Sequence, residues 1–441
     1  AQAKKADNAA ESLRAAGHTV NPATEPNIED EAVSTLHPVS QEVSNLSVAG
    51  LRPFALERYF ARHEFHAPHL LCCSDCEPLL QSELLSMADN ECRGLWDNLS
   101  LGYTESPGLP LLRDEISQSY ETGRIKSSDV IVVTPEEGIY ITARAILEPG
   151  DDVIVPWPCY QSLAEVATAI GCTVRRWEPR ASDASLEFCV EDLERLCAEK
   201  TPKLIVLNFP HNPTGATLST EDFARVISIC MEDDAGVQQP QPWIFSDEMY
   251  RGLEHQGTIR LEAACECYDR AVSLAGVSKV LSCPGLRIGW LATVNKKLME
   301  RLVVLKDYTT ICSSAPSEIL ALIALRQREE IGNRNLTLIQ SNMGALAAFM
   351  AENEDIITWR SPRAGSTCFP SLSPLVKRSA TAFCDDLVAR SGVLLLPASV
   401  YSELGDTSSP DRRIRIGFGR STVPACLQAL GPHLRDAAVA K

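Results

Sequence analysis

Short apolar runs alternate with amphipathic stretches through the middle of the chain. The runs are rich in β-branched residues, as in Val130–Thr134, and the stretches between them repeat apolar residues every three or four positions, as in a helix packed on one face. We predict strands at 130–134, 152–156, 172–177, 204–208, 243–246, 271–274 and 290–293, and helices at 111–120, 139–147, 159–170, 190–197 and 220–231. Strands that alternate with helices indicate an α/β fold with a mostly parallel sheet covered on both faces.

The pattern changes after Asn295. Helical spacing continues over 298–305, 317–328 and 336–350, and short strands are predicted near Cys368, at 393–396 and at 413–418. This part indicates a smaller α+β domain, to which a helix within 53–64 is expected to belong. We therefore predict an N-terminal tail at 1–48, partly disordered or helical, the first part of the small domain at 49–95, a large domain at 96–324 and the C-terminal small domain at 325–441.

Charge and composition exclude several classes of partner. The formal net charge of -17 argues against nucleic acid and against an anionic membrane surface, because both need clustered Lys and Arg. The longest apolar stretches, such as Leu320–Leu325, are too short to span a bilayer. Residues 1–17 lack an apolar signal core, so the sixteen cysteines predict reduced thiols in a cytoplasmic protein. Cys73 and Cys76 have the spacing of metal ligands but lack a suitable second pair, and we predict no metal site.

Three motifs carry candidate chemistry. Asn208-Phe-Pro-His-Asn-Pro-Thr-Gly215 follows a predicted strand, Ser246-Asp-Glu-Met-Tyr250 ends another, and Ser278-Lys-Val-Leu-Ser-Cys-Pro-Gly-Leu-Arg-Ile-Gly-Trp290 follows a third. Ligands of parallel sheets bind at the carboxyl ends of strands, where these polar residues are expected. Taken singly, each motif also fits an ordinary loop: a strand-to-helix turn, a solvated acid and a surface lysine.

Taken together and in this order, the three motifs resemble those of the class I/II aminotransferases, which are pyridoxal-phosphate (PLP) enzymes of fold type I. The resemblance covers roughly residues 95–420, and it implies a large domain with a mostly parallel sheet and a smaller α+β domain. Residues 70–77 differ from the Gly-rich substrate loop of many relatives, and the chain has some similarity to the branch that contains capreomycidine synthase.

The resemblance implies a role for each matching residue in holding the cofactor. Lys279 corresponds to the lysine that forms the Schiff base and later carries the proton, and Asp247 to the acid that faces the pyridine nitrogen. Tyr250 and Asn212 correspond to the pair that hydrogen-bonds the phenolic oxygen of the ring. The remaining matches are Arg287 for the phosphate, Tyr160 for stacking on the ring, and Ser278, Glu136 and Glu137 as further phosphate contacts, the two acids through backbone N–H groups.

Two further matches concern the substrate and a second subunit. Arg415, with Asn212, corresponds to the group that binds the substrate α-carboxylate, although Arg413 is an alternative on the same predicted strand. Tyr103 corresponds to a tyrosine that reaches the cofactor phosphate of the neighbouring subunit, which implies a homodimer with shared active sites. The phosphate loop departs from the family pattern, because Pro135 has no N–H to donate and Gly276 replaces a serine.

The implied reaction is transfer of an amino group between an amino acid and a 2-oxo acid. An alternative is elimination, cyclisation or oxidation of an amino acid on the same scaffold, since the same lysine, aspartate and arginine serve both kinds of chemistry. A regulator without activity is disfavoured, because Lys279, Asp247, Tyr250 and Arg287 are all present. The sequence does not identify the substrate.

Overall fold

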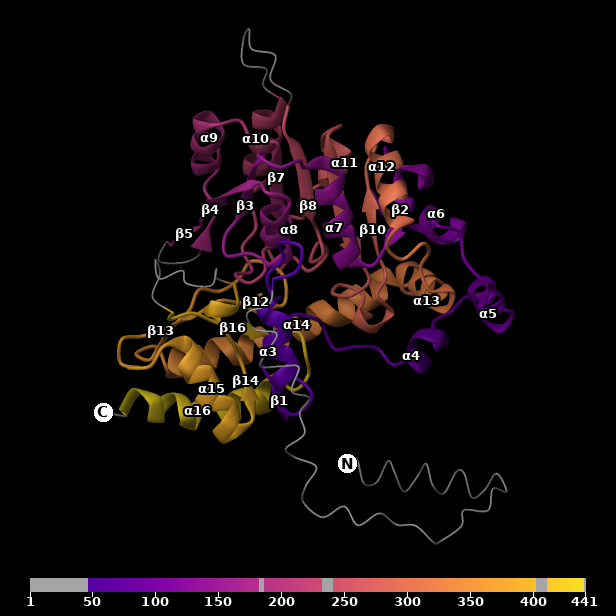
Figure 1. Ribbon diagram of the computed structural model, residues 1–441. Coiled ribbons are helices and arrows are strands. Elements are labelled where there is room, and N and C mark those ends of the chain that lie inside the picture. The colour runs from indigo at the N-terminus through magenta and orange to yellow at the C-terminus, as the bar shows by residue number, and fades with distance from the viewer. Residues whose placement is uncertain (1–46, 182–185, 232–240, 402–410, 440–441) are drawn as a thin grey trace, which may run out of the picture. The chain divides into compact units, whose positions relative to one another are not determined.

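A seven-stranded sheet carries the middle of the chain in the computed structural model, which describes residues 47–181, 186–231, 241–401 and 411–439 (Figure 1). The strand order is β2-β10-β9-β8-β7-β3-β4. These strands are β2 Val130–Val133, β3 Asp152–Pro156, β4 Thr173–Trp177, β7 Leu204–Asn208, β8 Trp243–Asp247, β9 Ala271–Gly276 and β10 Gly289–Ala292. Each lies within a few residues of a predicted strand.

The sheet is mostly parallel, as predicted. Strands β4, β3, β7, β8 and β9 run parallel, and β10 is antiparallel to both of its neighbours, β9 and β2. Asn208 at the end of β7 is in register with Asp247 at the end of β8, and Asp247 pairs with Leu274 of β9. The carboxyl ends of three adjacent strands therefore meet at one edge of the sheet, where ligands of this fold class bind.

Both faces of the sheet are buried. In β7, Ile205 and Leu207 join one hydrophobic cluster and Val206 joins another, because side chains alternate between the two faces of a strand. The helices that belong to this part are α6 Pro110–Gln118, α7 Pro135–Ile146, α8 Ser162–Ile170, α9 Val190–Glu199, α10 Thr220–Met231, α11 Ala264–Cys267 and α12 Lys296–Lys306. The short strands β5 Arg180–Ala181 and β6 Leu186–Glu187 form a separate two-stranded antiparallel sheet.

Short strands and long helices make up the C-terminal part. The helices are α13 Ala315–Arg326, α14 Arg328–Glu352, α15 Ala380–Ser391 and α16 Val423–Val439. The strands are β11 Ile357–Thr358, β12 Thr367–Cys368, β13 Ser371–Leu372, β14 Val393–Leu394, β15 Leu396–Pro397 and β16 Ile414–Gly417. The predicted helix at 336–350 is part of a longer one, since apolar positions before Leu336 are also buried.

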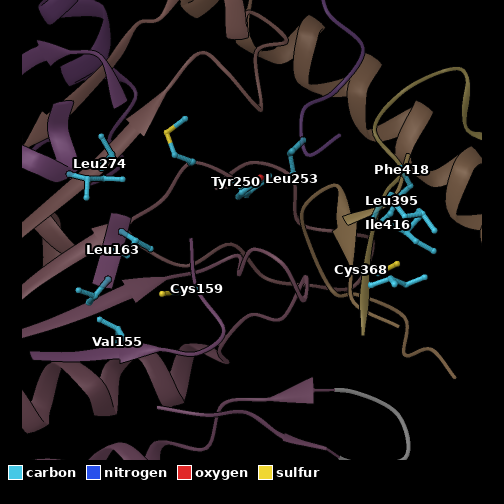
Figure 2. Close-up of a cluster of buried hydrophobic side chains, with 14 of the residues drawn as sticks. Val155, Cys159, Leu163, Tyr250, Leu253, Leu274, Cys368, Leu395, Ile416 and Phe418 are labelled. Carbon is cyan, nitrogen blue, oxygen red and sulfur yellow. The ribbon is translucent and has the colours of Figure 1, made fainter. Parts of the chain in front are cut away.

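Residues before the large sheet contribute to the C-terminal part. They form α3 Ala55–His63, β1 His69–Leu70, α4 Gln81–Ser86 and α5 Asn90–Asp97, and β1 pairs in parallel with β14. One buried cluster extends from Val155 and Leu274 of the sheet to Ile416 and Phe418, with Tyr250 between them (Figure 2). This cluster contains residues from both sides of the predicted domain boundaries at 95 and 324, so it does not divide the chain at those positions. The two boundaries stay predictions. Most of the predicted tail, residues 1–46, lies outside the described residues.

Three further observations bear on the composition of the chain. No helix within the described ranges has the length and apolar character that a membrane crossing needs. All sixteen cysteines lie in described segments, and all are free thiols. Over the same segments, no group of three or more His, Cys, Asp or Glu side chains is arranged to hold a metal ion.

Candidate active site

A cavity of about 230 Å³ lies where the carboxyl ends of β7, β8 and β9 meet. Nine of the predicted site residues line it: Glu136, Tyr160, Asn212, Asp247, Tyr250, Ser278, Lys279, Arg287 and Arg415. They come from six separate stretches of sequence, which the parallel sheet and β16 bring together. These nine side chains therefore bring an amine, two carboxylates, two guanidinium groups and several hydroxyls into one small space.

Lys279 follows β9 and is half-buried at the cavity wall. Its Nζ donates a hydrogen bond to Ser74 Oγ at 2.9 Å and lies 5.9 Å from the centre of the Tyr250 ring. The Tyr250 hydroxyl and Ser278 Oγ are both buried and have no hydrogen-bond partner within the described part of the chain. Since buried polar groups are normally paired, these two hydroxyls indicate a place for a ligand with oxygen or nitrogen acceptors.

Asp247 is the last residue of β8 and is buried. Its Oδ1 accepts a hydrogen bond from the Met249 backbone N–H at 3.2 Å. The pKa of Asp247 is raised to about 7, chiefly by burial and to a smaller extent by Glu248 and Glu136, while the Met249 N–H and Lys279 oppose the rise. Among the described residues, no cationic side chain is bonded to this carboxylate, so a cationic ligand nitrogen beside it would stabilise its charged form.

Arg415 in β16 is fully buried and has three hydrogen-bond partners. Its Nη1 donates to the Tyr401 hydroxyl at 2.6 Å and to Asn212 Oδ1 at 3.2 Å, and its Nη2 donates to the Cys72 carbonyl at 2.7 Å. No carboxylate is among these partners, so the positive charge of the guanidinium is available to an anion in the cavity.

The alternative arginine, Arg413, lies elsewhere. Its Nη1 donates to the Phe369 carbonyl at 3.0 Å, and it lines a different, smaller cavity of about 60 Å³. Arg413 precedes the first residue of β16, Ile414, so it lies outside the strand that carries Arg415 into the site. Of the two, only Arg415 lines the cavity that contains Lys279.

Glu136 occupies the first turn of α7, close to Tyr160 and Ser162. Burial raises the pKa of Glu136, and the hydroxyls of Ser162 and Tyr160 oppose the rise. The Tyr160 ring lies 5.0 Å from that of Phe54, centre to centre. Arg287 is more exposed than the others, and its Nη1 donates to the Pro284 carbonyl at 3.1 Å.

Two predicted residues do not line the cavity. The side chain of Glu137 turns away from it and accepts hydrogen bonds from Thr309 and from Thr310, whose Oγ1 lies at 2.8 Å. It also lies 3.9 Å from Nζ of the fully buried Lys306. The side chain of Tyr103 is 94% exposed and contacts no part of the cavity in a single chain.

Sequence reasoning missed several residues of the site. Ser74 contacts the lysine, Tyr401 contacts Arg415, and Asn208 and Glu57 line the cavity. Ser74 belongs to the 70–77 stretch, whose unusual composition was the one available signal. Glu57 lies on α3, and neither it nor Tyr401 stands in a motif that marks it in the sequence.

The chain is similar to one known protein family and to several solved structures. The model of the aminotransferase class I and II family matches residues 96–430. Capreomycidine synthase from Streptomyces vinaceus is 30% identical over 336 residues, which cover 74% of this chain and 81% of that protein. A PLP-dependent aminotransferase from Streptococcus suis superposes with a TM-score of 0.77 at 26% identity, covering 88% of this chain and 98% of the other. The PLP-dependent cyclase OrfR gives 0.76 at 26% identity, with 89% and 100% covered.

Proposed function

This chain belongs to the aminotransferase class I and II family, and we propose that Lys279 holds its cofactor while an amino acid and a 2-oxo acid exchange their amino group. Family membership and the fold-type I neighbours make it a PLP-dependent aminotransferase, as predicted from the motifs. The observation that carries the proposal is the convergence of Lys279, Asp247 and the unpaired Tyr250 hydroxyl in one cavity.

The residues of the cavity fit PLP chemically. A lysine amine, a buried carboxylate and two buried hydroxyls without partners match an aldehyde, a ring nitrogen and the oxygen atoms of the cofactor. When bound, PLP supplies a ring that withdraws electrons from the amino acid Cα. Asp247 would face the ring nitrogen, Tyr250 and Asn212 the phenolic oxygen, and Tyr160 the ring face. Arg287, Ser278 and the backbone N–H groups of Glu136 and Glu137 would hold the phosphate at the start of α7.

The chain's own groups then account for the remaining steps. Arg415 would bind the α-carboxylate with its two-pronged guanidinium, together with Asn212. Tyr401 holds Arg415 in place by accepting its Nη1 hydrogen at 2.6 Å. The Lys279 amine would take the proton from the substrate Cα and hold it for later return, which requires its nitrogen to come within reach of that carbon. Sequestration of the site from water would come from Leu56 and Phe60 of α3, which line the cavity.

A homodimer with shared active sites is part of the proposal. Leu101, Tyr103 and Tyr308 are large side chains exposed by 86%, 94% and 88%, which is unusual for apolar and aromatic residues of a monomer. A second copy that covers this surface would bring Tyr103 to the cofactor phosphate of the neighbouring subunit. We also propose a cytoplasmic location, which the sixteen free cysteines support.

The test of transamination is a pair of half-reactions followed by absorbance. Purified protein is loaded with PLP, and single amino acids are added in the absence of any oxo acid. A transaminase converts the cofactor to its amine form and stays in that state until a 2-oxo acid restores the original band. Turnover of the amino acid without an oxo acid, with the band unchanged at the end, would reject transamination.

A second candidate function is cyclisation of an amino acid on the same scaffold. The similarity to capreomycidine synthase and to the cyclase OrfR favours it over elimination and oxidation. The same residues would bind the cofactor and the carboxylate in both reactions. The half-reaction experiment distinguishes them, because a cyclase returns the cofactor to its starting form in every cycle and needs no amino acceptor.

A further inference from the structure

Residues 71–77 belong to no helix or strand, and they reach Lys279 from outside the large sheet. Within it, Ser74 lines the cavity, and its Oγ accepts a hydrogen bond from Lys279 Nζ at 2.9 Å. Among the hydrogen bonds and ion pairs of the described residues, this is the one made by the Lys279 amine. Neither the aminotransferase motifs nor the predicted roles involve Ser74.

The 71–77 segment is fixed against β16 and the residues that follow that strand. The Gly417 N–H donates to the Leu71 carbonyl and the Glu77 N–H to the Gly419 carbonyl, both at 2.9 Å. A Cβ atom at Gly417 would lie 1.8 Å from the Cys73 carbonyl oxygen, so only glycine allows the two backbones to come this close. The position of Ser74 is therefore set by backbone contacts on both sides.

The same segment also holds the arginine of the site. The Cys72 carbonyl accepts a hydrogen bond from Arg415 Nη2 at 2.7 Å, two residues before Ser74. The Ser74 carbonyl accepts one from Ser366 Oγ at 2.7 Å, which restrains the peptide that carries the hydroxyl. Cys72 thus contacts Arg415, which is proposed to bind the substrate carboxylate, and Ser74 contacts Lys279, which is proposed to move the proton. The short backbone between Cys72 and Ser74 sets the distance between these two contacts.

We propose that Ser74 is a positioning residue for the Lys279 amine. The inference rests on the proposed function of Lys279. Once Lys279 is released from the cofactor, its four-carbon side chain can rotate, and only some of its orientations place the nitrogen lone pair at the substrate Cα. The Ser74 hydroxyl accepts one N–H and so limits this rotation. No bond to Ser74 forms or breaks, and the proton travels on Lys279 alone.

The test compares Ser74→Ala with Ser74→Thr in the full chain loaded with PLP. A hydrogen bond from a neutral amine to a hydroxyl corresponds to an effect of up to roughly tenfold on rate. We expect Ser74→Ala to lower kcat about tenfold, to change KM little and to enlarge the isotope effect of Cα-deuterated substrate, because proton transfer becomes more rate-limiting. Ser74→Thr keeps the hydroxyl and should restore all three values. A kcat within twofold of wild type in Ser74→Ala, or an equal loss in Ser74→Thr, overturns the proposal.

A second readout does not depend on turnover. When cofactor-free protein is mixed with PLP, the absorption band that grows reports how readily Lys279 reacts as a nucleophile. Ser74→Ala should slow this growth while reaching the same final band, and an unchanged rate would count against Ser74. The proposed role of Lys279 is tested separately. If that role is wrong, Lys279→Ala retains the absorption band of the wild type, whatever the behaviour of Ser74→Ala.

Discussion

Replacing Tyr401 by phenylalanine removes one oxygen atom from the support of Arg415 and leaves the shape of the side chain unchanged. That oxygen lies 2.6 Å from Arg415 Nη1 and 3.4 Å from Asn212 Oδ1, and both residues are buried. A hydrogen bond to a charged group contributes about 1.5–3 kcal/mol. Arg415 keeps Asn212 and Cys72 as partners in the variant, so we expect a loss of binding free energy at the lower end of this range, about 1.5 kcal/mol. This loss corresponds to roughly a tenfold rise in KM for the amino acid.

Steady-state kinetics of Tyr401→Phe with the best amino acid donor measure this effect. Tyr59→Phe is the matched control, because Tyr59 belongs to the same hydrophobic cluster, is 3% exposed and has a hydroxyl without a partner. We expect the control to keep the wild-type KM and both variants to bind PLP as the wild type does. A KM in Tyr401→Phe equal to that of the control would refute the assignment of Arg415 to the substrate carboxylate.

Three other perturbations have defined outcomes. In cofactor-free protein, burial raises the pKa of Asp247 from 3.8 to about 7, so the folded state keeps this proton at pH values where the unfolded state has lost it. The unfolding free energy should therefore fall by a total on the order of 4 kcal/mol as pH rises from 4 to 8. Thermal melts of Asp247→Asn should lack this pH dependence. Gly417→Ala forces a Cβ into the Cys73 carbonyl and should lower the unfolding free energy by about 1–3 kcal/mol or more in urea denaturation. Tyr103→Ala should leave the unfolding free energy within about 0.5 kcal/mol but weaken PLP binding, as measured by titration of the cofactor.

Much of the fold followed from periodicity. Continuous apolar runs such as Leu204–Asn208 are typical of parallel strands buried on both faces, and every such run in the middle of the chain became a strand of the sheet. The antiparallel direction of β10 was not predictable, because the direction of a strand depends on the connection before it and not on its own residues. The helices shifted by a few residues at their ends, where the period is weakest.

The site was predictable where a local motif carried the chemistry. Lys279, Asp247 and Asn212 each follow or end a strand of the sheet, so their convergence followed once the strands were recognised. Ser74 and Tyr401 approach from remote parts of the chain, and only tertiary packing brings them within hydrogen-bond distance. Glu137 illustrates the opposite case: its neighbour Glu136 lines the cavity, but one step along a helix turns the side chain by about 100° onto Thr309 and Thr310.

The most direct measurement is to locate the cofactor on the chain. Protein loaded with PLP is reduced with borohydride, digested and mapped by mass spectrometry, with Lys279→Ala treated in parallel. We predict that the reduced cofactor is attached to the peptide that contains Lys279, and that the variant has neither the label nor the visible band. Attachment at a different lysine, or a band that persists in Lys279→Ala, would contradict the central claim.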